Sequence, residues 1–535
     1  GNHSGAILCG ATVTSIVIDG SVVGGDGPQS GRIESRFLPS VNIGGDLAGD
    51  GGRDSGSVYA FVSVGKIDIA GSIIGYATGL PAQPPIANGT IVSLGPVASI
   101  HVGGDIKGGA DLGSGSVVSL GTIASIVVDG SLIGGDQMWS GAIRSQDALG
   151  RSPALRPALT KVSIGGFIQG GKGDYSGVVQ SAGLIGTLSL PGTTPAPAGS
   201  PVSPGDVAGG SGHYSGSIHS GGNMGTIAIA GSLLGNADGS GQIYSEASIT
   251  KLTIGGSVKG QGFYGPDSTA GITAGQIVAL KVLTSLEITG SVFGGAGESS
   301  AGIDAGAIGS VIIHGSLYGG GGALSGSVRA FSRDLTSLKV DGVIEAKGLN
   351  TYLTISAEHI IGSVTAGSIV GSGGPVLIMA TGQSQPKTAA AAYAIKLVTS
   401  AGLMMNTQIV AGSFGTGGNL VLRNPEASVG TVEVGTGDQP NVYVGNDIAA
   451  GFTLAGSKSG LTSKSYYSCV VHVIIHGTIG QSSVPHYILG DLVHFVTVGG
   501  VPAPLKAGPE NDYRLPIGAN PAGLASVFAS EREGP

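Results

Sequence analysis

The sequence predicts an all-β protein, a parallel β-helix (β-solenoid) with coils of about 25 residues and three short strands in each coil. Glycine is abundant, with 103 copies among 535 residues. Short alternating runs of valine, isoleucine and leucine recur between these glycines. The run SIVIDGSVVGGDGPQSGRIES at 15–35 returns in similar form as SIVVDGSLIGGDQMWSGAIRS at 125–145, which indicates an internal repeat.

Each copy of the repeat is anchored by the glycine that follows its first apolar strand. Anchors are most often 25 or 26 residues apart, and larger gaps correspond to the same unit with an inserted loop. The anchors are Gly20, Gly45, Gly71, Gly104, Gly130, Gly166, Gly205, Gly231, Gly256, Gly290, Gly315, Gly342 and Gly367. An apolar residue stands two positions after the anchor, and a glycine usually stands four positions after it. A second glycine, usually within a Ser-Gly pair, stands eleven positions after it.

These phases predict which positions form strands and which form corners. Alternation over three or four residues indicates short, half-buried strands. The intervening glycines supply tight corners, including corners that need a positive φ. Serine hydroxyls beside the corner glycines are expected to satisfy backbone groups. Because the copies share one phase, each inward position becomes a ladder of aliphatic side chains, and the crossover rule favours a right-handed coil.

The regularity of the repeat divides the chain into four parts. We expect an N-terminal edge strand or cap at 1–13, the regular solenoid at 14–370, a less regular continuation at 371–500 and a Pro-rich cap or strap at 501–535. Within the third part, residues 387–402 fit either a short helix or a strand. Insertions are expected near 76–88, 146–159, 191–204 and 275–284. They leave different corners, so they predict no common cleft.

Composition excludes several classes of partner. The net charge is −8 and no basic tract occurs, which argues against a nucleic-acid partner. No apolar run is long enough to span a membrane. Two cysteines are too few for a disulfide framework. A chain rich in small residues and poor in cysteine favours a secreted bacterial protein, located outside the cell or at its surface.

The Gly-Ser-apolar coils resemble those of bacterial secreted β-helix exoproteins, including autotransporter passengers and filamentous-haemagglutinin-like proteins. The resemblance is one of architecture and covers most of the chain. It implies an extracellular adhesin or a structural polymer.

The acidic residues do not predict a hydrolase. Glycoside hydrolysis needs two carboxylates on one face, roughly 5 to 9.5 Å apart. Asp46, Asp105 and Asp206 share a phase but skip coils, so we interpret them as solvated corner acids. The chain is therefore expected to have no catalytic residues and to be non-enzymatic.

The histidines do not predict a strong metal site either. His472 and His476 lie on one side of an expected strand, where four residues span about 13 Å, too far for one ion. His486 and His494 leave a C-terminal site as a minor alternative. We therefore expect neither a metal nor another cofactor.

The position three residues after the anchor points away from the core and is often large and apolar. Such a column predicts a contact face, unless inserted loops fold over it. Together with the two cysteines, the expected assembly contacts are Cys9, Val23, Ile74, Ile133, Leu234, Phe293, Tyr318 and Cys469. The cysteines are expected to be buried thiols or, alternatively, to join neighbouring subunits.

The sequence favours a self-assembling structural subunit of an extracellular filament or surface coat. Its partner would be a second copy of the chain, bound head-to-tail or laterally. The alternative is an adhesin that binds host or carbohydrate surfaces through its inserted loops. A polysaccharide lyase or glycoside hydrolase ranks third. Sequons at Asn2 and Asn88 suggest modification.

Overall fold

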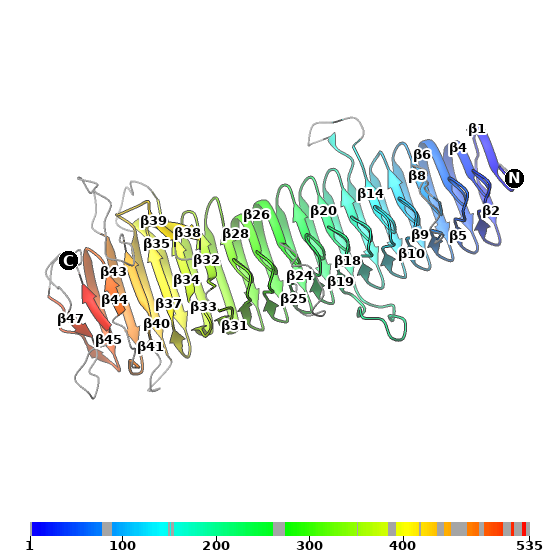
Figure 1. The fold of residues 1–535 in the computed structure, drawn as a ribbon. Helices are drawn as coiled ribbons and strands as arrows, with labels where there is room; N and C mark the ends of the chain where they lie inside the picture. The colour runs from blue at the N-terminus through cyan, green and yellow to red at the C-terminus, as the bar shows by residue number, and fades with distance from the viewer. Residues whose placement is uncertain are drawn as a thin grey trace. The chain divides into compact units, whose positions relative to one another are not determined.

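A computed structural model describes residues 3–76, 88–147, 150, 155–260, 273–349, 351–383, 392–416, 419–435, 443–450, 468–480, 486–506, 515–517 and 527–530. The chain divides into two compact units, 1–281 and 282–535. Each unit is a parallel β-solenoid, as the repeat predicts (Figure 1). Across the described ranges, no helix is long and apolar enough to cross a membrane.

The strands of the first unit form three columns, and each column holds one strand or strand segment per coil. The first column contains β2 (Ile16–Ile18), the ends of β4 (Ile33–Ile43) and β6 (Val58–Ile69), β9 (Val97–Val102), β12 (Ile123–Val128), β15 (Leu159–Ile164), β18 (Ile185–Leu190), β21 (Met224–Ile229) and β24 (Ile249–Ile254). The second contains β3 (Val22–Val23), β5 (Leu47–Ala48), β7 (Ile73–Ile74), β10 (Ile106–Lys107), β13 (Leu132–Ile133), β16 (Ile168–Gln169), β19 (Val207–Ala208), β22 (Leu233–Leu234) and β25 (Val258–Lys259). The third contains β1 (Ile7–Thr12), the starts of β4 and β6, β8 (Ile91–Ser93), β11 (Val117–Ser119), β14 (Ile143–Ser145), β17 (Val179–Ser181), β20 (Ile218–Ser220), β23 (Ile243–Ser245) and β26 (Ile277–Ile288).

Pairing within these columns is parallel and keeps equivalent residues of the repeat side by side. In the first column, for example, Ile126 pairs with Val162, which pairs with Leu188. All three side chains are buried, at 0 to 1% exposed. The aliphatic ladders that the repeat predicts are therefore the core of the unit.

Serine and aspartate side chains at the corners connect the backbone within and between coils. The hydroxyl of the Ser-Gly pair accepts a hydrogen bond from the N–H five residues earlier, as in Ser140 to Gly135 at 3.0 Å. This confirms the expected role of these serines. The carboxylates of Asp46, Asp105 and Asp206 accept the N–H of a serine in the next coil, at 2.7, 2.7 and 2.6 Å. These acids are therefore structural, and Asp206 is buried rather than solvated.

The second unit keeps the same three columns with more irregular connections. The first contains the end of β28 (Ile303–Ile313), β31 (Leu335–Ala346), β33 (Ile361–Gly371), β35 (Tyr393–Ser400), β40 (Ser428–Val434), β43 (Cys469–Ile475) and β45 (Leu492–Val498). The second contains β27 (Val292–Phe293), β29 (Leu317–Gly319), the ends of β31 and β33, β36 (Met404–Met405) and β41 (Tyr443–Val444). The third contains the start of β28, β30 (Val328–Ala330), β32 (Leu353–Ala357), β34 (Val376–Ala380), β37 (Thr407–Ala411), β42 (Asp447–Ala450), β44 (His486–Leu489) and β48 (Val527–Ser530). Antiparallel pairs join β38 (Ser413–Thr416) to β39 (Asn419–Leu422), β46 (Val501–Pro502) to β45 and β47 (Leu515–Ile517) to β48.

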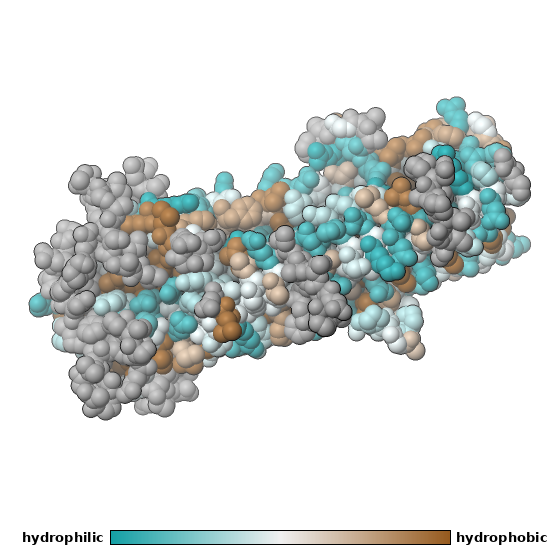
Figure 2. Space-filling view, in the orientation of Figure 1, coloured by the Kyte–Doolittle hydropathy of each residue, from teal (hydrophilic) through white to brown (hydrophobic). Residues whose placement is uncertain are grey.

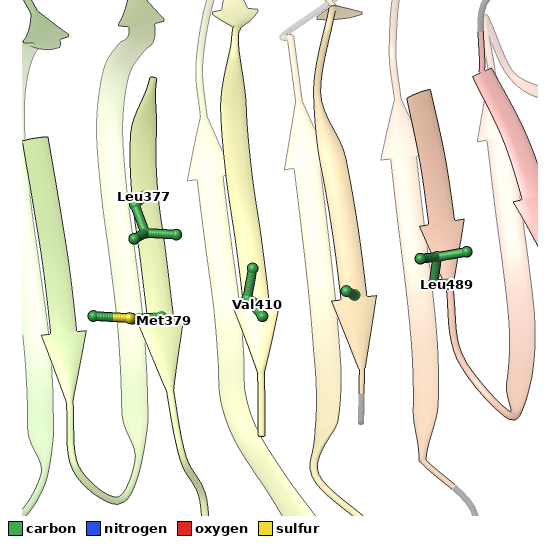
Figure 3. Packing of buried hydrophobic residues seen from close by; sticks show 5 residues of the cluster. Leu377, Met379, Val410 and Leu489 are labelled. Carbon is green, nitrogen blue, oxygen red and sulfur yellow. The ribbon is translucent and has the colours of Figure 1, made fainter. Parts of the chain in front are cut away.

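A second hydrophobic cluster covers part of the third column in this unit (Figure 3). Met379, Val410, Ala449 and Leu489 occupy equivalent positions on β34, β37, β42 and β44. Together with Leu377 they are buried, and Leu420 of β39 packs against the cluster. This face of the second unit is therefore apolar and covered.

Two expectations about connections are settled by the structure. The ambiguous segment 387–402 forms strand β35 from Tyr393 onward, while 387–391 lie outside the described residues. The loop expected at 275–284 is wrong, because β26 begins at Ile277 and runs through that segment. Its alternation of apolar residues continues the repeat, so a strand forms instead of an insertion.

Candidate functional site

Three consecutive coils of the first unit place an aromatic residue at the same corner position. Trp139, Tyr175 and Tyr214 each stand two residues before the corner glycine, with φ values of 63°, 53° and 55°. Flanking coils have Gly113 and Gly239 at this position, also with positive φ. The equivalent corner residues Gln29, Asp54 and Leu324 also have positive φ, so this conformation belongs to the repeat and the aromatic side chains distinguish the three coils.

The three aromatic rings form a stacked ladder. The Trp139 and Tyr175 ring centroids are 4.4 Å apart, and those of Tyr175 and Tyr214 are 5.0 Å apart. Interplanar angles of 18° and 16° show that the rings lie nearly parallel. A Cβ at Gly239 would lie 2.3 Å from the Tyr214 ring, so this ring packs closely against the backbone of the next coil.

A second row of side chains runs along the neighbouring third column. Arg144, Gln180, His219 and Tyr244 are paired in register on β14, β17, β20 and β23. Each is half-buried. The Arg144 guanidinium lies 3.7 Å from the Trp139 ring centroid, and the His219 ring lies 5.8 Å from Tyr214 and 5.6 Å from Tyr244. The row therefore packs directly beside the aromatic ladder.

The insertion after β14 supplies the opposite side of this row. Arg156, from the described end of the insertion, reaches three coils along to pair with Glu246 at 3.4 Å. Its guanidinium also donates to the Gly221 carbonyl at 3.5 Å. These contacts hold the end of the insertion against the coils that carry His219 and Tyr244.

Two adjoining cavities lie along the row. One, of about 370 Å³, is lined by Trp139, Arg144, Ser145, Gln146, Asp147, Gln180 and Ala182. The other, of about 320 Å³, is lined by Asp147, Gly150, Arg156, Gln180, Ser181, Ala182, His219, Ser220, Gly221, Tyr244 and Glu246. They share Asp147, Gln180 and Ala182, so we call them together the groove. It follows the stacking direction of the coils.

Burial sets the protonation of the groove side chains. It lowers the pKa of His219 to about 4, so the ring is neutral at pH 7. Its Nε2 is buried and has no hydrogen-bond partner among the described residues. Burial also raises the pKa of Tyr244, which keeps its phenol protonated. The pKa of Arg144 falls to about 10, so its guanidinium remains cationic. At neutral pH the groove thus presents planar donors and acceptors.

The expected assembly contacts in the outward column differ in exposure. Val23 is 60% exposed, whereas Ile74, Ile133, Phe293 and Tyr318 are half-buried. Leu234 departs from the expectation, because it is 6% exposed and packs with Val202 from the loop that follows β18 (Figure 1). Ile133 packs against the same cluster. On the face drawn in Figure 2, hydrophobic residues are interspersed with hydrophilic ones.

The two cysteines, the two sequons and the candidate metal ligands are also singled out by the sequence. Cys9 and Cys469 are half-buried in different units and form no disulfide with each other. Asn88 is buried and its amide donates to Asp111 at 2.8 Å, so it is a poor glycan acceptor, while Asn2 lies outside the described residues. Within the described part of the chain, no group of three or more His, Cys, Asp or Glu side chains is arranged to hold a metal ion.

Fold and site together define a parallel β-solenoid with a polar groove beside an aromatic ladder. No family model matches the chain, and no curated protein or solved structure matches it either.

The sequence contains a signal for this groove. It is the spacing of aromatic and polar residues from the corner glycines. The ladder residues stand two positions before the corner glycines Gly141, Gly177 and Gly216. The row residues stand three positions after the corner glycines, in four successive copies. Among the expected insertions, only the one at 146–159 contributes to the groove, through residues such as Asp147 and Arg156. The sequence alone could not show that this insertion folds back over the column.

Proposed function

We propose that the protein binds a polysaccharide chain along the groove of its first unit, without cleaving it. The observation that carries this proposal is the stacked ladder of Trp139, Tyr175 and Tyr214 beside a row of planar polar side chains. This proposal is a form of the adhesin alternative. It differs in that the binding site is formed by strands together with one insertion.

The form of the groove favours a linear, hydroxyl-rich ligand. Arg144, Gln180, His219 and Tyr244 place polar groups along the groove, and Trp139 adds an aromatic face. The row repeats once per coil, at about 4.8 Å, which is comparable with one sugar residue of an extended chain. A glycan chain satisfies both features.

The proposal is for binding without cleavage. Hydrolysis needs one carboxylic acid and one carboxylate acting together on the scissile bond. Glu246 is engaged by Arg156 at 3.4 Å. We expect neither new reducing ends nor unsaturated products when the protein is incubated with a glycan that it binds.

Trp139 provides a direct test, because it is the only tryptophan of the chain and it lines the groove. A bound glycan is expected to change Trp139 fluorescence in a saturable titration. Tyr244→Ala, at the other end of the row, is expected to weaken binding about tenfold through loss of a ring and a hydroxyl.

The matched control is Phe61→Ala, which removes a 44% exposed aromatic ring of the same unit outside the groove. It is expected to leave binding unchanged. Glycans that bind the protein without affecting Trp139 emission, or equal effects of the two substitutions, would contradict the proposal. So would a glycan panel with no ligand at all.

Self-assembly into a filament or surface coat stays a prediction, with Val23 as its most exposed expected contact. Electron microscopy of the concentrated protein tests it. Strictly monomeric particles without lateral order would contradict it.

A further inference from the structure

Arg144 is a half-buried cation that pairs with no carboxylate among the described residues. Its guanidinium lies over the Trp139 ring at 3.7 Å, and the Gln146 amide oxygen, in its better-satisfied orientation, accepts from it. Burial is the cause of its altered pKa, and within the described residues no carboxylate forms an ion pair with it. Its in-register neighbours, Val118 and Gln180, are uncharged.

Arg329, Arg32 and Arg156, which are also at least partly buried, each pair with a carboxylate. Arg329 occupies the equivalent outward position in the second unit, and Asp304 of the preceding coil accepts from it at 2.6 Å. Arg32 pairs with Glu34 at 2.7 Å. In the groove itself, Arg156 has Glu246. Arg144 therefore differs from the fold's own pattern of charge compensation.

A partly desolvated charge is costly unless an opposite charge or good hydrogen bonds compensate it. Stacking on Trp139 offsets part of this cost and fixes the plane of the guanidinium. A fixed guanidinium presents a fork of donors that matches the two oxygens of a carboxylate or sulfate. Because Arg144 lines the groove, a ligand can bring such a group to it.

We propose that Arg144 binds the acidic group of an anionic polysaccharide, either a uronate carboxylate or a sulfate ester, lying in the groove. This inference rests on the proposed glycan binding and specifies its ligand class. Arg144 and Trp139 line the same cavity, so the acidic group is expected at the Trp139 end of the groove.

The test compares matched acidic and neutral glycans by calorimetry. Polygalacturonate is paired with its fully methyl-esterified form, and a sulfated galactan with the desulfated galactan. The protein is expected to bind at least one acidic member at least tenfold more tightly than its neutral match, and the two pairs distinguish carboxylate from sulfate. Added salt is expected to reduce this preference.

Arg144→Gln is expected to abolish the preference for the acidic member of each pair. Arg144→Lys keeps the positive charge but loses the forked arrangement of donors. This variant is expected to retain only part of the preference for the acidic glycan. The control is Arg53→Gln, which removes a 58% exposed arginine of the same unit. Thermal unfolding of each variant verifies its fold.

The outcomes separate this inference from the proposed function. Equal binding of acidic and neutral glycans, or an unchanged preference in Arg144→Gln, overturns the role of Arg144 while glycan binding stands. If none of the four glycans binds, the inference is overturned, and a wider neutral panel then decides whether glycan binding fails too.

Discussion

Gly141→Ala is expected to destabilise the first unit by at least about 4 kcal/mol. Gly141 is a corner residue with φ of +62°, and a Cβ there would lie 1.9 Å from the Ile133 carbonyl oxygen. That oxygen belongs to backbone rather than to a flexible side chain, so β13 would have to shift. A loss of this size is a large part of the 5–15 kcal/mol that stabilises a typical domain. Chemical unfolding, with the midpoint in urea as readout, measures it.

Gly113→Ala is the matched control for this prediction. Gly113 lies one coil earlier with φ of +66°, but a Cβ there would meet nothing within 4 Å. Alanine at this position is then disfavoured only by the left-handed backbone conformation. We expect the free energy of unfolding to fall by about 1–2 kcal/mol. Equal destabilisation by the two substitutions would show that backbone conformation, and not the close approach of coils, makes glycine necessary.

His219 is expected to make the protein less stable as the pH falls from about 6.5 to about 4. Burial lowers its pKa in the folded state to about 4, whereas a histidine in the unfolded chain titrates near 6.5. Between these values the unfolded state binds the additional proton, so stability decreases as the pH falls. The full difference corresponds to up to about 3 kcal/mol, and the half-buried side chain makes this an upper value.

His219→Phe isolates this contribution, because it keeps a ring between Tyr214 and Tyr244 but removes the titrating group. The variant is expected to lose less stability than the unsubstituted protein between pH 7 and pH 4. Urea unfolding at both values, taken as the difference between the two proteins, cancels the other titrating groups. Identical pH dependence would contradict the expectation.

His101 provides a comparison of opposite sign. The hydrogen bond to Asp68 at 2.9 Å, together with one to Asp129 at 3.1 Å, raises its pKa. Its stabilising contribution is therefore present below pH 6.5 and is lost as the pH rises through the raised value. His101→Gln is expected to destabilise the protein chiefly at low pH, by less than about 1 kcal/mol because the pair is exposed.

The same outward positions have different surroundings in the two units. In the first unit, Arg144, Gln180, His219 and Tyr244 line a groove. In the second, Met379, Val410 and Leu489 belong to a buried cluster, with β39 packed against it. The inward residues of both units are aliphatic because the core requires it. Outward positions do not have to be aliphatic, so they carry polar groove residues in the first unit and apolar cluster residues in the second.

The sequence by itself determined the coil, its strands and its corners. Period-two alternation and regularly spaced glycines are local signals, and repetition in one phase makes stacking the way to bury residues such as Ile126 and Leu188. The serine hydroxyls at the corners followed from the same local chemistry. These features depend on neighbours within one coil or on its repetition.

Only the tertiary structure decided the groove. It showed that Trp139, Tyr175 and Tyr214 have positive φ, and that the end of an inserted loop returns to bring Arg156 to Glu246, 90 positions further along the chain. It also showed that Arg144 has Trp139 beside it, but no acid of the kind that Asp304 provides for Arg329. The physical reason is that inward positions obey the repeat, whereas the contacts of outward side chains depend on loops and on neighbouring coils that no single copy encodes.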